Sequence, residues 1–442
     1  MERQYKDSGL KWIGRIPETW KVDRFKNKFK TGKGLNITKG DLVSEGIPVV
    51  SYGQIHSKQN TGTRLDVFLI RYIPSRLAEE GVSSKVSVGD FIFADTSEDI
   101  DGCGNAVYVD KEIGLYAGYH SVIAFAKHPE ESKYYAYLFL TECWRSQIRM
   151  RVTGIKVFSI SQAILNETTI ILPPLAEQQR IADFLDKKCG EIDGLIALQE
   201  QMIENLKAYK QSVITEAVTK GLNPDAKIVP SGINWIKEIP EGWKVLPVKR
   251  MCQNITDGSH FSPNTVGEGK AYITVSNVYN DEVHVDEAAK ISIDDFSVLV
   301  ANGCQPPIGS VLLAKDGTVG RTAVVQDNDY VVLSSLGILT PLGTVLSKYL
   351  KYLLDSDPLQ AQMQLAMAGS ALRRITITKI CKLIGIQPPL SEQKAIITHL
   401  NEKCADIDRL IGLKQKKIEK LKDYKKSVIY EAVTGKTDLL DN

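Results

Sequence analysis

The chain has 442 residues, of which 43% are hydrophobic and 24% charged, with a formal net charge of +2. This composition is ordinary for a globular protein of two or three domains, and the weak net charge is unlike the strong basic bias of a DNA-binding protein that acts alone. Seven scattered cysteines without a CxxC pair argue against a zinc ribbon or a disulfide framework. No run of about 20 apolar residues is present, so we predict a cytoplasmic protein without a membrane contact.

The first predicted domain opens with the motif Trp12-Ile-Gly-Arg-Ile-Pro-Glu-Thr-Trp20. Residues 21–131 then alternate short apolar runs with turn residues, which is typical of strands. The strands that we predict here are Ile47–Tyr52, Val86–Phe93 and Ser121–Ala126. A helix is predicted from Ser132 to about Met150, followed by a loop that contains glycine.

A long helix is predicted next, over residues 175–219. It follows Pro173-Pro174, and its apolar residues recur at steps of three and four without a Gly or Pro cluster. Such a narrow apolar seam requires a partner helix. We expect Ile192, Leu195 and Leu206 to lie in the pairing seam.

The second predicted domain repeats this order. Trp235-Ile-Lys-Glu-Ile-Pro-Glu-Gly-Trp243 opens it, and a second long helix over residues 390–434 closes it. The strands predicted between them are Ala271–Val275, Val311–Ala314 and Tyr330–Leu333, with a helix from Ser347 to about Met367. The seam residues expected in the second long helix are Ile407, Leu410 and Leu421.

From Ser132 to the end of the first long helix, the two copies are related by a constant offset of 215 residues, which matches Ser132 with Ser347 and LAEQQ at Leu175 with LSEQK at Leu390. The first helix carries five Lys/Arg and eight Asp/Glu, the second ten and seven. Opposite net charges favour pairing of the two helices with each other, and the connections favour an antiparallel pair. We therefore predict an α+β fold: two mixed α/β domains separated by two long antiparallel helices, with an internal pseudo-two-fold repeat. The predicted bounds are 1–171 and 221–386 for the domains, 172–220 and 387–442 for the helices and tail.

Sequence motifs for catalysis or cofactor binding are missing. The first Pro-Pro pair lacks the preceding acidic or amide residue of an amino methyltransferase loop, Gln387 precedes the second pair, and neither pair is followed by the aromatic residue of that loop. No GxGxxG follows a strand, no GxxxxGK[ST] occurs, and the six histidines have no metal-ligand spacing. We expect no catalytic residue, no metal and no cofactor on this chain.

The repeated PPLxEQ start of each long helix and the WIxxIPExW opening of each half resemble the specificity subunits of Type I restriction-modification systems. Further strings resemble elements of that family: VGDFIFADTSED (Val88–Asp99), YAGYH (Tyr116–His120), TDGSHFSP (Thr256–Pro263) and IGSVLLAKDGTVGR (Ile308–Arg321). The resemblance covers essentially the whole chain.

The resemblance implies a non-catalytic subunit in which each target-recognition domain reads one half of a bipartite, asymmetric DNA site. The helices would set the spacer and dock two methyltransferase (M) subunits, and endonuclease/translocase (R) subunits would join. S-adenosylmethionine, ATP and magnesium would belong to these partner subunits. The alternatives are a self-contained DNA methyltransferase and a structural coiled-coil adaptor.

The candidates for contacts with double-stranded DNA are polar residues of the divergent domains, because Arg, Lys, Ser, Thr and His donate to phosphates and base edges. In the first domain they are Lys33, Thr96, Ser97, His120 and Lys156; in the second they are Asp257, Ser259, His260, Lys315, Thr318, Arg321, Arg373 and Arg374. Lys156 and the two arginines belong to the corresponding loops 154–158 and 369–374. For any one of these residues, an ordinary solvated or structural role is equally compatible with the sequence.

Overall fold

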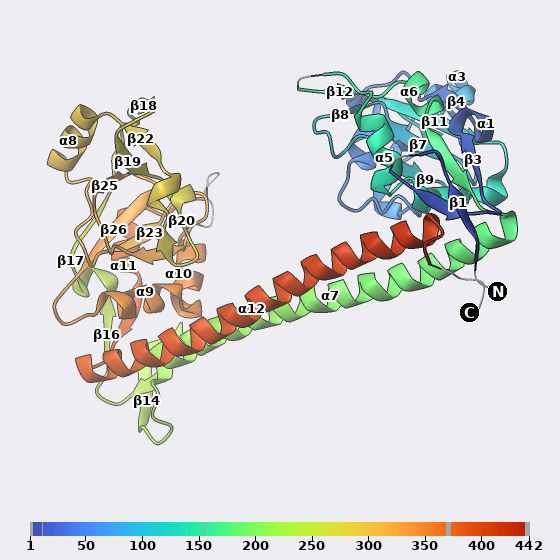
Figure 1. Ribbon diagram of the computed structural model, residues 1–442. Coiled ribbons are helices and arrows are strands. Elements are labelled where there is room, and N and C mark those ends of the chain that lie inside the picture. Colours follow the sequence, from blue (N-terminus) through green and yellow to red (C-terminus); the bar gives the residue numbers. More distant parts are fainter. Residues whose placement is uncertain (1–2, 11, 155, 368–372, 438–442) are drawn as a thin grey trace. The chain divides into compact units, whose positions relative to one another are not determined.

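The computed structural model (Figure 1) describes residues 3–10, 12–154, 156–367 and 373–437. The chain divides into two compact units, of which unit 1 comprises Met1–Leu198 with Lys417–Asn442 and unit 2 comprises Gln199–Lys416. The helix α7 (Leu175–Lys220) begins in unit 1 and ends in unit 2, whereas α12 (Leu390–Val433) begins in unit 2 and ends in unit 1.

Unit 1 is built around an antiparallel four-stranded sheet. Its strand order is β4 (Phe29–Lys33), β11 (Ser121–Ala126), β7 (Phe91–Ala94) and β9 (Ala106–Tyr108). Because side chains alternate along a strand, Phe91 and Phe93 join one core cluster and Ile92 and Ala94 another. The first cluster includes residues of α4 (Ser132–Leu138) and α5 (Glu142–Arg149); the second includes residues of α2 (Tyr52–Ile55), β5 (Ile47–Val50) and β10 (Tyr116–Ala117).

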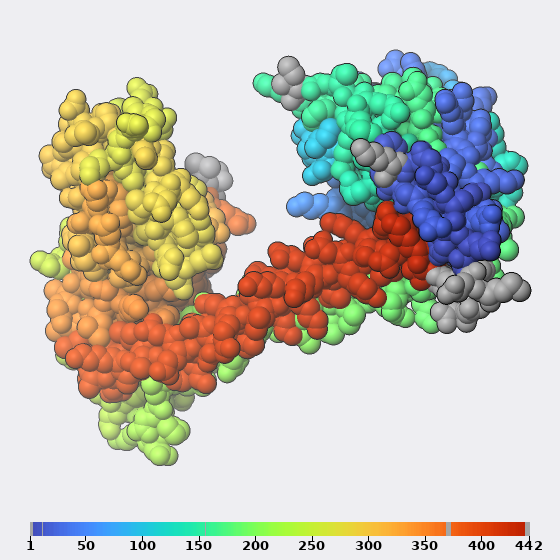
Figure 2. Space-filling model, in the orientation of Figure 1, coloured from blue at the N-terminus to red at the C-terminus, as the bar shows by residue number. Residues whose placement is uncertain are grey.

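The remaining elements of unit 1 are short. They are β1 (Tyr5–Asp7), β2 (Arg15–Pro17), β3 (Lys21–Arg24), α1 (Phe25–Lys28), β6 (Arg71–Ile73), α3 (Ser75–Glu80), β8 (Thr96–Ser97), β12 (Phe158–Ser159), α6 (Gln162–Asn166) and β13 (Thr169–Leu172). The pair β3–β13 leads directly into α7. The N-terminal residues lie against the end of α12 (Figure 2), where the Tyr5 hydroxyl donates to the Gly435 carbonyl oxygen at 3.1 Å.

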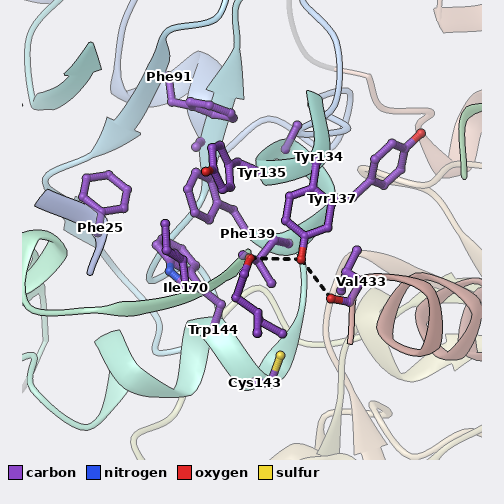
Figure 3. Packing of buried hydrophobic residues seen from close by; sticks show 14 of the residues in the cluster. Phe25, Phe91, Tyr134, Tyr135, Tyr137, Phe139, Cys143, Trp144, Ile170 and Val433 are labelled. Carbon is purple, nitrogen blue, oxygen red and sulfur yellow. Dashed lines mark hydrogen bonds between the residues drawn. The ribbon is translucent and has the colours of Figure 1, made fainter. Parts of the chain in front are cut away.

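Buried hydrogen bonds attach the long helices to the core of unit 1. The Tyr134 hydroxyl lies 3.2 Å from the Ile171 carbonyl oxygen and 2.9 Å from that of Val433, at the end of α12 (Figure 3). The indole Nε1 of Trp20 donates to Glu177 Oε2 at 2.8 Å, in the first turn of α7. Both bonds tie the start of one helix and the end of the other to the same core.

Unit 2 repeats this frame. Its four-stranded sheet has the order β17 (Cys252–Asp257), β26 (Leu336–Pro341), β23 (Val311–Ala314) and β24 (Thr322–Val324). The Tyr349 hydroxyl lies 2.9 Å from the Ile386 and 3.4 Å from the Val218 carbonyl oxygen, and Trp243 Nε1 donates to Glu392 at 3.0 Å. The predicted α+β class and the internal repeat are confirmed.

The other elements of unit 2 are β14 (Ile228–Ile233), β15 (Ile236–Pro240), β16 (Lys244–Pro247), β18 (Thr265–Val266), β19 (Lys270–Ile273), β20 (Val278–Tyr279), β21 (Glu282–Val283), β22 (Ala289–Ile291), α8 (Ile293–Ala301), β25 (Tyr330–Val332), α9 (Ser347–Asp355), α10 (Asp357–Met367), α11 (Ile377–Lys382) and β27 (Ile384–Gln387). The two units also contain 3₁₀ turns, among them η3 (Val82–Ser84) and η5 (Val248–Arg250).

The long helices pair in opposite directions within each unit, as predicted. In unit 1, Lys425 lies 2.7 Å from Asp193, and Ile181 shares a core cluster with Ile429. In unit 2, Lys210 lies 2.8 Å from Asp408. As the residue number increases along α7, from Asp193 to Lys210, that of the partner in α12 decreases, from Lys425 to Asp408, so the pairing is antiparallel.

The seam differs from the prediction at two positions. Ile192 and Ile407 are buried, and Leu206 and Leu421 are half-buried, but Leu195 and Leu410 remain 46% and 41% exposed. At about 100° per residue, a step of three from a seam residue turns a side chain about 60° off the seam, whereas a step of seven returns within about 20°. Gln199 is accordingly the buried residue one heptad after Ile192.

Several predicted boundaries were also wrong. The strand expected over Val86–Phe93 begins only at Phe91, because Gly89 (φ 98°) forms a turn before it. The helix expected over residues 132–150 divides before Thr141, whose hydroxyl donates to the Leu138 carbonyl oxygen. The one expected over residues 347–367 divides at Ser356, two residues before Pro358.

The strand expected to end at Tyr52 ends at Val50, and α2 follows with a capping box at Ser51. The strands expected over Ala271–Val275 and Tyr330–Leu333 are shifted or shortened by one or two residues, to Lys270–Ile273 and Tyr330–Val332. Ser121–Ala126 and Val311–Ala314 match their predicted bounds.

Candidate nucleic-acid interface

The DNA-contact candidates of unit 1 lie at one end of the four-stranded sheet. The pairing register sets Lys33 opposite Val122, and Val122 opposite Phe93. Lys33 therefore ends β4 at the level where β11 begins, just after His120, and where β7 ends, just before Asp95. Three adjacent strands span about 10 Å, so the sequence-distant candidates share this sheet end.

His120 and the loop around Lys156 complete this sheet end. His120 has φ 51°, and its Nδ1 lies 3.3 Å from Asp95 Oδ1. Strand β8 pairs with β12, with Phe158 opposite Ser97, and this pairing brings the loop that carries Lys156 next to Thr96. The Ser97 side chain is only 1% exposed, so the role expected for it as a DNA contact does not agree with its burial; Thr96 is half-buried. In that loop, Ile155 lies outside the described residues.

A cavity of about 410 Å³ adjoins this sheet end. Tyr52, His56 and Asn105 line it beside the carboxylates Glu98 and Asp99. The His56 Nε2 donates to the Thr96 carbonyl oxygen at 3.0 Å, and Nδ1 accepts from the Asn105 amide at 3.2 Å. Burial, and then the nearby carboxylates, raise the pKa of Tyr52.

Sequence reasoning did not identify Tyr52, His56 or Asn105 as site residues. His56 and Asn105 are 49 positions apart, and no spacing in the sequence signals that they meet. The capping box at Ser51, which begins α2, is the local signal that could have placed Tyr52 after the strand rather than in it.

Unit 2 gathers its candidates at the equivalent sheet end. Asp257 lies opposite Gly337, and Gly337 opposite Leu313, so β17 and β23 end at the same level. An isolated bridge joins Asp316 to Arg374, and the Gly317 amide donates to the Arg373 carbonyl oxygen at 3.1 Å. Residues 369–372 of this predicted loop lie outside the described residues.

Lys315 is at the centre of this group, but it is buried. Its side chain is 3% exposed, and its Nζ lies 3.3 Å from Asp257 Oδ2 and 3.7 Å from Asp316 Oδ2. A buried ammonium group is retained where carboxylates pair with it. The direct DNA contact that we expected from Lys315 does not agree with this burial, and the side chain instead positions Asp257 and Asp316.

The exposed donors around Lys315 are His260, Arg373 and Arg374. The His260 side chain is 71% exposed, and its Nε2 lies 3.3 Å from Asp257 Oδ2. The Arg374 Nε lies 3.3 Å from Asp316 Oδ1. Ser259 is buried, and its hydroxyl donates to the Phe261 carbonyl oxygen at 2.6 Å, so a contact of this side chain with DNA does not agree with the structure either.

Thr318 is exposed in the loop after β23, and Arg321, further along, faces a different hollow. Arg321 lines a cavity of about 970 Å³ together with Lys207 and Gln211 of α7. It is therefore not grouped with His260 and Arg374, and sequence proximity to Lys315 gave no sign of this.

Two ion pairs of the buried Lys351 lie beside the same cavity. Lys351 Nζ is 2.7 Å from Asp281 Oδ1 and 2.9 Å from Asp355 Oδ2, and Thr322 donates to Asp355 at 2.5 Å. Burial lowers the pKa of Lys351, but Asp355 and Asp281 raise it, and the net shift is upward. Burial raises the pKa of Asp355 although Lys351 opposes this.

Both sheet ends present groups that can bind nucleic acid. Exposed cations and hydroxyl groups donate to phosphates and to the acceptors of base edges. Among the described residues, no group of His, Cys, Asp and Glu is arranged to hold a metal ion. The same part of the chain contains no helix that is long and apolar enough to cross a membrane.

Comparisons with known proteins agree with this arrangement. The family model "Type I restriction modification DNA specificity domain" matches residues 17–208 and 240–423. A Methanocaldococcus jannaschii protein named "Putative type I restriction enzyme MjaX specificity subunit" is 25% identical over 98% of this chain and 97% of its own length. The EcoKI specificity subunit of Escherichia coli (strain K12) is 21% identical over 96% of this chain and 90% of its own.

A solved structure from work on complex assembly and conformational transition of the type I R-M system has the same fold. It aligns with a TM-score of 0.69 at 18% identity, over 96% of this chain and 99% of its own. Since the family model matches once in each half and covers most of the residues, the chain belongs to the family of Type I restriction modification DNA specificity domains and is a DNA sequence-specificity subunit of that class.

Proposed function

We propose that each sheet end reads one half of a bipartite, asymmetric site in double-stranded DNA, and that the chain itself performs no catalysis. One observation carries this proposal: the same sheet end in both units assembles polar residues from distant segments, but with different side chains. Unit 1 presents His120 and Lys156, whereas unit 2 presents His260 and an arginine pair. Different donors select different bases, so the two half-sites differ.

Arg373 and Arg374 are the sharpest test of this reading. Arginine donates two hydrogen bonds to guanine O6 and N7, which is worth about 1–3 kcal/mol of discrimination. We expect Arg373→Ala or Arg374→Ala to relax one position of one half-site by roughly 5- to 150-fold. The unit 1 half-site should remain unchanged.

The measurement is sequencing of methylated adenines after co-expression with a cognate methyltransferase subunit. Arg250→Ala is the matched control, because Arg250 is also exposed in unit 2 but lies in η5, away from the sheet end. Unaltered specificity in both arginine variants would show that this loop does not read bases.

The helix pair supplies the surface for partner subunits in this proposal. Leu195 and Leu198 of α7 are 46% and 49% exposed, and their equivalents Leu410 and Leu413 of α12 are 41% and 55% exposed. Tyr209 and Tyr424 form a third such pair, 56% and 51% exposed. A surface that is duplicated with its exposed apolar residues fits two copies of one partner, here the methyltransferase (M) subunit.

Subunit stoichiometry tests the docking surface. Replacing Leu195 and Leu198 with Ser should lower the number of bound M subunits from two to one in native mass spectrometry. Gln201→Ser, at an exposed polar position on the same helix, is the control. Two M subunits bound to the leucine variant would contradict docking at this surface.

Catalysis in this proposal belongs to the partners: S-adenosylmethionine to the M subunits, and ATP and magnesium to the endonuclease/translocase (R) subunits. The complex acts on DNA in the cytoplasm. The purified chain should transfer no methyl group from labelled S-adenosylmethionine to DNA. Transfer without a partner would favour the rival, a self-contained methyltransferase, and absence of DNA binding by the complex would favour a structural adaptor.

A further inference from the structure

The most basic segment of unit 1 runs along its sheet edge. Residues 21–33 contain six Lys/Arg and one Asp. Lys28 is paired with Glu131 at 3.0 Å, whereas Lys30 and Lys33 on β4 are exposed. Strand β4 is the edge of its sheet, because β11 is its one partner in the strand order.

The backbone of β4 offers donors at this edge. The Gly34 amide donates to the Ser121 carbonyl oxygen at 3.1 Å, which continues the register that sets Lys33 opposite Val122. Pairing in an antiparallel ladder alternates, so the N–H and C=O groups of Thr31 and Lys33 point to the open edge. The Lys33 carbonyl oxygen agrees with this orientation: it accepts a hydrogen bond from the Ser84 hydroxyl at 3.0 Å, on the side away from β11.

A hollow of about 390 Å³ lies at this point. Its lining includes Lys30, Thr31, Lys33, Asn36 and Ser83. Among the described residues that line it there is no carboxylate, although Asp and Glu are nearly as numerous in the chain as Lys and Arg.

Two glycines, Gly32 and Gly34, line this hollow at positions where a side chain does not fit. A Cβ atom at Gly34 would lie 2.0 Å from the Gly118 carbonyl oxygen, and one at Gly32 would lie 2.7 Å from the Phe125 ring. Backbone atoms of Gly32, between Lys30 and Lys33, therefore line the hollow. Backbone amides that face the open edge, the ammonium groups of Lys30 and Lys33 and the Ser83 hydroxyl surround one hollow and match the oxygens of a phosphate group.

We infer that this hollow is a subsite for a backbone phosphate of the bound DNA, an inference that rests on the proposed function. It adds a contact that fixes the position of unit 1 on the duplex without reading sequence. The corresponding strand of unit 2, Cys252-Gln-Asn-Ile-Thr-Asp257, has no Lys or Arg. The two readers thus differ in their electrostatic contact at this edge as well as in their base contacts.

The test is the salt dependence of DNA binding by the full chain in complex with its partner subunits. Each neutralised phosphate contributes about 0.9 to the slope of log K against log salt. Lys30→Gln/Lys33→Gln removes one phosphate contact, so the slope should fall by about 0.9, and the deficit in affinity against wild type should shrink about 3.5-fold between 50 and 200 mM salt. The loss at a given salt concentration should be equal for cognate and unrelated DNA.

Two variants control this experiment. Lys58→Gln/Lys111→Gln removes the same charge from exposed positions of unit 1 outside the hollow, and its slope should match wild type. Lys30→Arg/Lys33→Arg keeps the charge and should keep the slope. If wild type binds DNA but the glutamine variant has an unchanged slope, or loses affinity for the cognate site alone, the phosphate subsite is refuted while the proposed function stands. If wild type does not bind DNA, both fail.

Discussion

The buried lysine of unit 2 allows a stability prediction with a worked sign. Lys351 is 7% exposed and lies between Asp281 and Asp355, at 2.7 and 2.9 Å. Lys351→Met removes the cation but leaves the buried carboxylate of Asp355. Breaking a buried pair on one side typically costs about 3–5 kcal/mol, and we expect unit 2 to lose stability in this range at pH 7.

The pH dependence follows from Asp355. Its pKa is raised in the folded protein by burial, against the opposing effect of Lys351. A raised carboxyl pKa means that the folded state binds the proton more tightly, so this group destabilises the fold above that pKa and ceases to do so as the pH falls. Without Lys351 the pKa rises further. The deficit of Lys351→Met should therefore shrink as the pH is lowered from 7.

Two measurements test this at pH 7 and at lower pH. Urea unfolding gives the stability, and hydrogen exchange of peptides from α9 reports the region around Lys351. Lys348→Met is the matched control, because Lys348 is exposed on the same helix, and it should change stability by less than about 0.5 kcal/mol. Lys351→Met/Asp355→Asn, which removes both charges, should recover part of the loss. A Lys351→Met deficit equal to that of the control, or one that does not vary with pH, would refute the reasoning.

Other predictions concern the frame. Tyr134→Phe removes the hydroxyl that contacts two buried carbonyl oxygens; we expect a loss of about 1–3 kcal/mol and faster hydrogen exchange at the end of α12, and unchanged exchange there would contradict it. Four residues inserted into each long helix add ~6 Å, so the methylated motif should keep both half-sites and lengthen its gap by at most about two base pairs of 3.4 Å; an active protein with an unchanged gap would exclude the helices as the spacer. Replacing residues 21–131 should change one half-site only, and sequencing of methylated sites that shows both halves altered would contradict separate readers.

The frame was predictable because its determinants lie close together in sequence or are repeated. The helical seam recurs every three or four residues, and the Tyr anchors recur at an offset of 215 and the Trp anchors at an offset of 223. Errors arose where a local polar contact outweighs apolar patterning. Thr141 and Ser356 interrupt predicted helices by bonding to carbonyl oxygens three residues earlier, and such bonds compete with helix continuation.

The candidate site was predictable only in part, because it depends on contacts between distant strands. That Lys315 follows a strand was evident from the sequence, but its burial depends on Asp257, which lies on β17, and on the register of the strand β26 between them. Arg374 and His260 were identified as donors without any sign that they share a site. For Arg321, the turn after Lys315 directs the chain towards α7. The direction of this turn could not be predicted from the sequence.

The hydrogen bonds of the frame explain how the two readers diverge on one scaffold. Tyr134 and Tyr349 bond to backbone carbonyl oxygens, which every residue type supplies. In unit 1 that carbonyl belongs to Val433 of α12, and in unit 2 to Val218 of α7. Each core is thus closed by the end of a helix that begins in the other copy of the repeat. The sheet ends take no part in these bonds, so substitutions there would alter the residues that we propose contact DNA and would leave the attachment of the helices intact.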